Sequence, residues 1–146
     1  MRVMVIIKAS EDSEAGVMPT EKMLADMHKF NEELVNKGIM LEGEGLHPTS
    51  KGKRVKFTAG NRIVTDGPFA ETRELIAGFW LWRVKSMDEA VEWVQRIPFD
   101  YEEVKADTEV EIRQVFDADD FGAELTPELR RLQDTIRAKA EKLKQV

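Results

Sequence analysis

The stretch "TDGPFAETRELIAGFWLWRVK" (residues 65–85) joins a tight polar turn to a strongly hydrophobic segment. From Ile76 onward the side chains alternate with a period of two, which indicates a β-strand with two distinct faces. One face carries Trp80, Trp82 and Val84, and the other carries Phe79, Leu81 and Arg83. Because both faces carry large apolar side chains, we expect the sheet that holds this strand to be covered on both sides.

The N-terminal third of the chain predicts one strand and one helix. "RVMVIIK" (2–8) is a short β-branched run, typical of a buried strand, and "SEDSEAGVMP" (10–19) is expected to be a polar loop. A helix is expected over residues 20–37, ended by Gly38 in a left-handed conformation. Its apolar stripe consists of Met23, Met27, Phe30 and Leu34.

Three further strands are expected before the opening stretch ends. "IMLEGEGLHP" (39–48) predicts a strand that its two glycines bend or bulge. "VKFT" (55–58) and "RIVT" (62–65) predict a hairpin, with its turn at Gly60 and Asn61.

After the opening stretch, the chain predicts one more helix and one more strand. "SMDEAVEWVQRIP" (86–98) has a capping box of Ser86 and Glu89, and "TEVEIRQVF" (108–116) is a final strand. The order strand, helix, several strands, helix, strand predicts a pair of split β-α-β units, with an antiparallel sheet and both helices on one face. A second subunit would cover the other face, so a homodimer is expected.

The C-terminal segment "TPELRRLQDTIRAKAEKLKQV" (126–146) predicts an amphipathic helix that begins with Thr126 as its cap and Pro127 at its first position. Its single apolar stripe consists of Leu129, Leu132, Ile136, Ala140 and Leu143. Such a stripe on an otherwise charged helix implies docking on the chain's own surface or on a protein partner.

Composition excludes several functional classes. A length of 146 residues suits one main domain, and a net charge of −6 argues against a general nucleic-acid binder. The chain has no cysteine, which excludes disulfides, thiolate nucleophiles and cysteine-based zinc sites. The N-terminal apolar run is too short for a membrane span and lacks a signal-peptide cleavage region, so a cytoplasmic location without membrane binding is expected.

Two histidines are candidates for acid/base chemistry because imidazole changes protonation near neutral pH. His47 follows a predicted strand that carries Glu44, so it could act as a general acid or base oriented by a carboxylate. The sequence alone favours the alternative, a strand-end histidine that caps a turn. His28 lies beside the apolar stripe of the first helix and is expected to be half-buried, with a backbone or water partner.

The turn that contains Asp66, Gly67 and Pro68 has two explanations. Asp66 can accept hydrogen bonds from nearby backbone N–H groups and so make the loop rigid. The same rigidity could hold its carboxylate beside Phe69 and Glu71, where two acids could exchange a proton. Both explanations remain open at this stage.

Metal and cofactor sites have little support in the sequence. Glu44, His47, Asp66 and Glu71 could be combined into a metal site, but their spacing does not demand one, and no metal is expected. The basic run over residues 51–56 could hold an anion, although such runs are more often solvated loops. No phosphate loop, nucleophile elbow or zinc-protease pattern is present, so no cofactor is expected.

Four blocks together resemble the YCII-related proteins, specifically the branch named for its DGPF motif. They are "EGEGLHPTSKG" (42–52), "VTDGPFAETRELIAGFWLW" (64–82), "SMDEAVEWVQRIP" (86–98) and "EIRQVF" (111–116). The resemblance covers residues 1–122 and leaves residues 123–146 as a C-terminal amphipathic extension.

This resemblance implies a ferredoxin-like βαββαβ fold with an extra hairpin, paired with a second copy as a dimeric α/β barrel. It implies a pocket near the sheet and the dimer interface, and a His–Asp pair that matches His47 and Asp66 here. Smaller relatives have their histidine nearer the first helix, where this chain has His28. The residues expected to bind a ligand are Glu44, Phe69, Glu71 and His28. Proteins of this branch often occur beside extracytoplasmic-function sigma factors, which implies a signalling accessory role.

Three functional hypotheses follow. The first is a homodimeric protein that binds a small molecule or serves as a signalling accessory. The second is a small acid/base enzyme, without a cofactor, that uses His47 and Asp66. The third is a partner-binding module that acts through the C-terminal helix.

Overall fold

The computed structural model describes residues 1–71, 73–99 and 107–145, in two compact units, Met1–Gln114 and Val115–Val146. Val146, the last residue of the expected C-terminal segment, lies outside the described residues. The first unit contains strands β1 (Arg2–Lys8), β2 (Met40–Gly45), β3 (Lys53–Thr58), β4 (Asn61–Asp66), β5 (Ile76–Arg83) and β6 (Val110–Gln114). Its helices are α1 (Glu11–Glu14), α2 (Glu21–Asn36), the 3₁₀ turn η1 (Thr49–Lys51) and α3 (Met87–Val94). The second unit contains the 3₁₀ segment η2 (Ala118–Glu124) and helix α4 (Pro127–Leu143).

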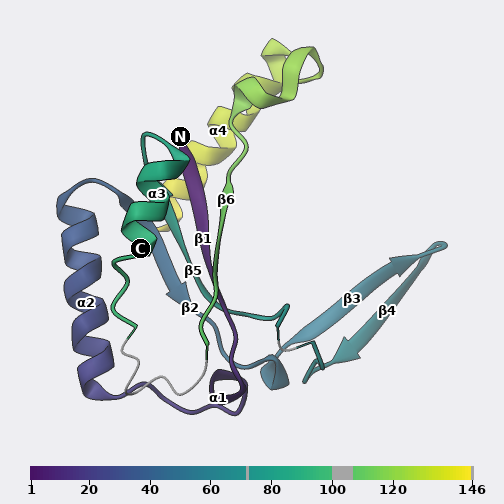
Figure 1. Cartoon of the computed structure of the whole chain (residues 1–146). Coiled ribbons are helices and arrows are strands. Elements are labelled where there is room, and N and C mark those ends of the chain that lie inside the picture. The colour runs from purple at the N-terminus through teal and green to yellow at the C-terminus, as the bar shows by residue number, and fades with distance from the viewer. Residues whose placement is uncertain (72, 100–106, 146) are drawn as a thin grey trace. The chain divides into compact units, whose positions relative to one another are not determined.

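The architecture is mixed α+β, as the sequence predicts. Four strands form an antiparallel sheet in the order β2-β5-β1-β6, and β3 and β4 form a separate hairpin (Figure 1). Helix α2 connects β1 to β2, and β5 lies between those two strands. Helix α3 connects β5 to β6, with β1 between them. Each helix therefore joins two strands that flank a third, which is the expected split arrangement.

The hydrophobic core lies between the sheet and the two helices. Trp80 and Trp82 on β5 face this core, as the alternation in the opening stretch predicts, and Trp82 is completely buried. The Phe30 ring of α2 lies 6.1–6.5 Å from the ring centroids of Trp80, Trp82 and Trp93 of α3. Burial of each large apolar side chain stabilises the fold by about 1.5–3 kcal/mol, so this aromatic cluster fixes both helices on one face.

The opposite face of the sheet is also apolar at its centre. The pairing of β1 with β5 places Met4 beside Leu81 and Ile6 beside Phe79, all on the face opposite the one that packs on α2 and α3. On the edge strand β2, Glu44 lies opposite Phe79 in the register and so belongs to this same face. We call the set Met4, Ile6, Phe79 and Leu81 the second face.

Two turn details differ from the sequence prediction. The hairpin turn is Ala59–Gly60, with φ of 44° and 81°, rather than Gly60–Asn61, because Asn61 already pairs with Thr58 in the ladder. The irregularity in β2 falls between Met40 and Glu42, upstream of both glycines.

Gly43 of β2 faces the core, and its lack of a side chain is explained by packing rather than by the expected bend of the strand. A Cβ atom on Gly43 would lie 2.7 Å from Cδ1 of Trp80, so the missing side chain makes room for the indole ring. Packing, not strand curvature, explains this glycine.

The expected polar loop over residues 10–19 contains the short helix α1. Ser10 and Ser13 exchange hydrogen bonds as a capping box, with the Ser13 N–H donating to Ser10 Oγ at 3.1 Å and the Ser10 N–H to Ser13 Oγ at 2.8 Å. Local caps of this kind can hold one helical turn without an apolar stripe, which is why hydrophobic periodicity missed it. Among the helices that the structure describes, none is long and apolar enough to cross a membrane.

Candidate functional site

The loop after β4 is packed tightly on the η1 turn. The Gly67 N–H donates to the Gly52 carbonyl at 3.0 Å. A Cβ atom on Gly67 would lie 1.7 Å from the Thr49 carbonyl oxygen, a distance that excludes any side chain. The glycine of the DGPF motif is therefore required by a close approach of two backbone segments.

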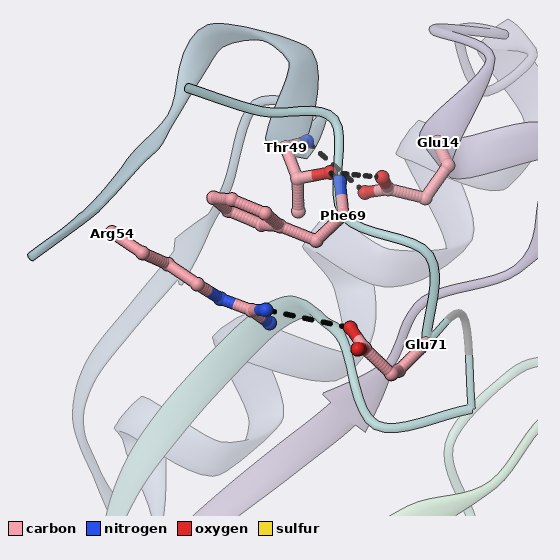
Figure 2. A network of polar contacts seen from close by, with 5 residues as sticks. All are labelled: Glu14, Thr49, Arg54, Phe69 and Glu71. Carbon is pink, nitrogen blue, oxygen red and sulfur yellow. Dashed lines mark hydrogen bonds and ion pairs between the residues drawn. The ribbon is translucent and has the colours of Figure 1, made fainter. Parts of the chain in front are cut away.

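Thr49 is the centre of a polar network that joins three segments (Figure 2). Its hydroxyl donates to a Glu14 carboxylate oxygen at 2.5 Å, and its N–H donates to the other oxygen at 3.1 Å. The same hydroxyl accepts the Phe69 N–H at 3.1 Å. Hydrogen bonds that a charged carboxylate accepts are stronger than those between two neutral groups. This network therefore fixes α1, η1 and the DGPF loop to one another.

Phe69 and Glu71 share one cationic neighbour. The Arg54 guanidinium of β3 lies 3.9 Å from the centroid of the Phe69 ring, and its Nη1 lies 3.4 Å from Glu71 Oε2 (Figure 2). Both side chains of this ion pair are more than half exposed, so the pair contributes only about 0–1 kcal/mol. The cation over the ring adds a contribution of similar size.

Asp66 has a different partner from the one expected for catalysis. Its carboxylate forms an ion pair with Lys53, directly opposite on the hairpin, and both side chains are exposed. Two cations of the basic run thus have carboxylate partners: that of Lys53 lies at the end of β4, and that of Arg54 lies in the loop that follows the hairpin. This pairing makes the basic run part of the loop's support and weakens its interpretation as an anion site.

The two histidines lie in separate places. His47 is exposed in the segment between β2 and η1, and no hydrogen bond or ion pair connects it to Asp66 within the described residues. His28 is exposed on α2 rather than half-buried, with Nδ1 2.6 Å from the Leu24 carbonyl one turn earlier. The expected backbone partner of His28 is therefore present, on its own helix.

The expected site residues consequently fall into three groups. Asp66 ends β4, and Phe69 and Glu71 lie in the anchored loop that follows it. Glu44 lies on the same side of the sheet as the second face, and His47 lies in the segment that follows β2. His28 stands alone on α2. Within residues 1–71, 73–99 and 107–145, no three His, Cys, Asp or Glu side chains gather as metal ligands, so the metal site considered from the sequence does not form there.

Sequence patterns missed the two residues that anchor the DGPF loop. Glu14 and Thr49 are 35 residues apart, and Thr49 and Phe69 are 20 apart. Neither residue belongs to a recognisable motif with its partner. The only local signal was the concentration of Gly and Pro on both sides, over residues 48–52 and 67–68, which marks two turns but not their contact.

Comparison with known proteins identifies a domain family. The sequence model described as "YCII-related domain" matches residues 1–118. An uncharacterized protein from Rhizobium meliloti (strain 1021) is 35% identical over 75 residues, which span 51% of this chain and 60% of that protein. A solved structure of the 5-chloro-2-hydroxyhydroquinone dehydrochlorinase from Burkholderia phenoliruptrix AC1100, in complex with 2,5-dihydroxybenzoquinone, is 17% identical. It superimposes with a TM-score of 0.42 over 80% of this chain and 96% of that one.

Proposed function

The chain belongs to the YCII-related domain family, and from this premise we propose that it is a homodimeric protein that binds a small molecule. In this proposal the fold is ferredoxin-like, two copies pair through their sheets as a dimeric α/β barrel, and the DGPF loop is a scaffold. The protein acts in the cytoplasm as an accessory to sigma-factor signalling, the role implied by its resemblance to the DGPF branch.

The observation that carries the proposal is the second face. Its four apolar residues lie on the two central strands, β1 and β5, on the side of the sheet that α2 and α3 do not cover. An apolar sheet face of this kind favours burial against another surface. A second copy offers the same face by two-fold symmetry, so the interface would be self-complementary.

The ligand would lie at the edge of this interface. Glu44 lies on the same side of the sheet as Phe79, and His47 follows three residues later in the chain. In this proposal their carboxylate and imidazole border the apolar surface. Such a border suits a compact, largely apolar molecule with a polar group that can donate a hydrogen bond. The scaffold role of the DGPF loop rests on the fixed position of Gly67 and on the ion pair of Asp66.

Leu81→Lys tests the dimer. The substitution puts a charge at the centre of the second face. Both proteins carry Glu128→Lys, which weakens the separate α4 contact proposed below, and we expect sedimentation velocity to show a dimer for the protein with Leu81 and a monomer for the Leu81→Lys variant. Met18→Lys is the control, because Met18 is 80% exposed in the segment before α2. Circular dichroism confirms that the variant is folded, and the milder Leu81→Ser replaces it if it is not. With the α4 contact weakened in both proteins, a monomer with Leu81 in place, or a folded Leu81→Lys variant that stays dimeric, would refute pairing through this face.

The acid/base enzyme is the alternative, favoured by one observation. The His47 side chain makes no hydrogen bond or ion pair within the described part of the chain, so its imidazole is available for chemistry. NMR titration of His47 in the wild type and in Asp66→Asn tests the coupling, with His28→Gln to assign the two histidine signals. A titration curve that moves with Asp66→Asn supports the His–Asp pair, whereas an unchanged curve supports the scaffold role.

A further inference from the structure

Helix α4 exposes a continuous apolar stripe. Its large apolar side chains are exposed by 48% at Leu129, 53% at Leu132, 57% at Ile136 and 75% at Leu143. No residue of this 17-residue helix is buried. Most of the stability of helices in proteins comes from the packing of an amphipathic face, so α4 gains stability if this stripe packs against another surface.

The stripe has the spacing of a coiled-coil seam. Leu129, Ile136 and Leu143 of α4 recur every seven residues, and Leu132 lies four residues before Ile136. In heptad notation these are the a and d positions, which lie together along one side of a helix. The other d position of α4 is Lys139, whose aliphatic stem can cover an apolar neighbour while its ammonium group stays in water.

The residues that flank the seam indicate the orientation of the partner. The three g positions are Glu128, Thr135 and Lys142, an acid near the start, a neutral residue in the middle and a base near the end. In an antiparallel pair of identical helices, g positions meet g positions, so Glu128 of each copy meets Lys142 of the other. In a parallel pair, g positions meet e positions, which here are Gln133 and Ala140 and carry no charge.

We propose that α4 pairs with α4 of a second copy of this chain, in antiparallel orientation and centred on Thr135. Leu132 of one copy then packs on Ile136 of the other, and Leu129 packs on the aliphatic stem of Lys139. Two ion pairs between Glu128 and Lys142 flank this seam and select the second copy as the occupant by charge complementarity. The pairing uses only residues of the second unit, so it does not depend on the sheet-to-sheet dimer.

Cysteine cross-linking locates this contact directly. The chain has no cysteine, so Thr135→Cys introduces a single thiol at the centre of the proposed pair. We expect a short bis-maleimide to link two copies of Thr135→Cys. The control Asp134→Cys points away from the seam, and its cross-linked yield should be lower by about tenfold or more. Equal yields for the two variants, or no cross-link in either, would overturn the proposal.

Charge reversal identifies the occupant. On the Thr135→Cys background, Glu128→Lys sets lysine against lysine in both flanking contacts, and Lys142→Glu sets glutamate against glutamate. We expect each variant alone to lose about tenfold in cross-linked yield, because two attractive contacts become repulsive. An equimolar mixture of the two variants forms two attractive contacts again and should recover the yield.

The mixture separates charge pairing from a damaged helix. Glu128→Lys also places a cation at the N-terminus of α4 and lowers its helicity, an effect that mixing cannot reverse. A mixture that stays at the low yield would refute the antiparallel pair. It would instead assign the stripe to docking on the sheet of its own chain or on a different protein.

Discussion

At the scale of single residues, the DGPF motif is best explained by the space around its glycine. Gly67 lies so close to the Thr49 carbonyl that a methyl group cannot be placed there without moving one backbone segment. Asp66 and Phe69, on either side of Gly67 and Pro68, then have partners of their own in Lys53 and Thr49. The motif is thus a set of contacts that fix one loop conformation, and any ligand contact would be additional to this role.

Gly67→Ala should destabilise the protein by about 2–4 kcal/mol, because the added methyl forces η1 and the loop apart. Gly45→Ala is the matched control, since a Cβ atom there meets nothing within 4 Å, and it should change stability by less than about 1 kcal/mol. Urea denaturation monitored by tryptophan fluorescence measures both. Equal stabilities of the two variants would contradict the close packing of Gly67.

Thr49→Val should be far more harmful than Thr49→Ser. Valine keeps the shape of threonine but removes the hydroxyl, which leaves the Phe69 N–H without its partner and Glu14 with one bond instead of two. An unsatisfied, partly buried polar group costs about 1–3 kcal/mol. Serine keeps the hydroxyl, so its free energy of unfolding should stay within about 1 kcal/mol of the wild type. Similar free energies of unfolding for the two variants would contradict a stabilising role of the hydrogen bonds of Thr49.

At the scale of elements, the hairpin β3–β4 stands out in the first unit because it lies outside the four-stranded sheet and leaves apolar side chains exposed. It forms its own two-stranded sheet, and its apolar side chains Val55, Phe57, Ile63 and Val64 are 49–69% exposed. A two-stranded hairpin alone is only marginally stable in water. Its turn adds strain, because Ala59 has a φ of 44°, a left-handed conformation that residues with a Cβ atom rarely adopt.

Ala59→Asn should stabilise this hairpin. Asparagine tolerates the left-handed conformation better than alanine does, and Asn-Gly is the favoured pair for a two-residue turn of this kind. We expect hydrogen exchange of the β3 and β4 amides to slow by about twofold to fivefold, which corresponds to about 0.4–1 kcal/mol. Exchange in β1 and β5 should not change, which serves as the internal control. Unchanged exchange in the hairpin would show that the turn does not limit its stability.

At the scale of the whole molecule, the sequence predicted the sheet and its helices because their signals are local. The alternation around Trp80 and the stripe that ends at Leu34 each depend on neighbours a few residues away, and both are confirmed. The support of the DGPF loop was not predictable, because it depends on Glu14 and Thr49, which the fold brings together from distant segments. The ion pair of Asp66 with Lys53 was not predictable for a similar reason, since it follows from the hairpin register.

The division of the chain into two units makes a prediction about stability. All residues of the core cluster lie between Val3 and Ile97, inside the unit Met1–Gln114. A chain cut after Gln114 keeps this core, so its free energy of unfolding should fall by no more than about 1–2 kcal/mol. Its denaturation, measured by fluorescence of the three tryptophans, should remain a single cooperative transition.

The slope of that transition with urea identifies the contribution of the second unit. The slope scales with the surface that becomes exposed on unfolding. If residues 115–146 unfold independently of the core, the slope of the fluorescence transition is the same for the full chain and for the cut chain. A much shallower slope and an early transition in the cut chain would show that α4 and the sheet unfold as one cooperative body. In that case the apolar stripe of α4 would pack against its own chain rather than against a second copy. The Thr135→Cys cross-link should then be absent as well.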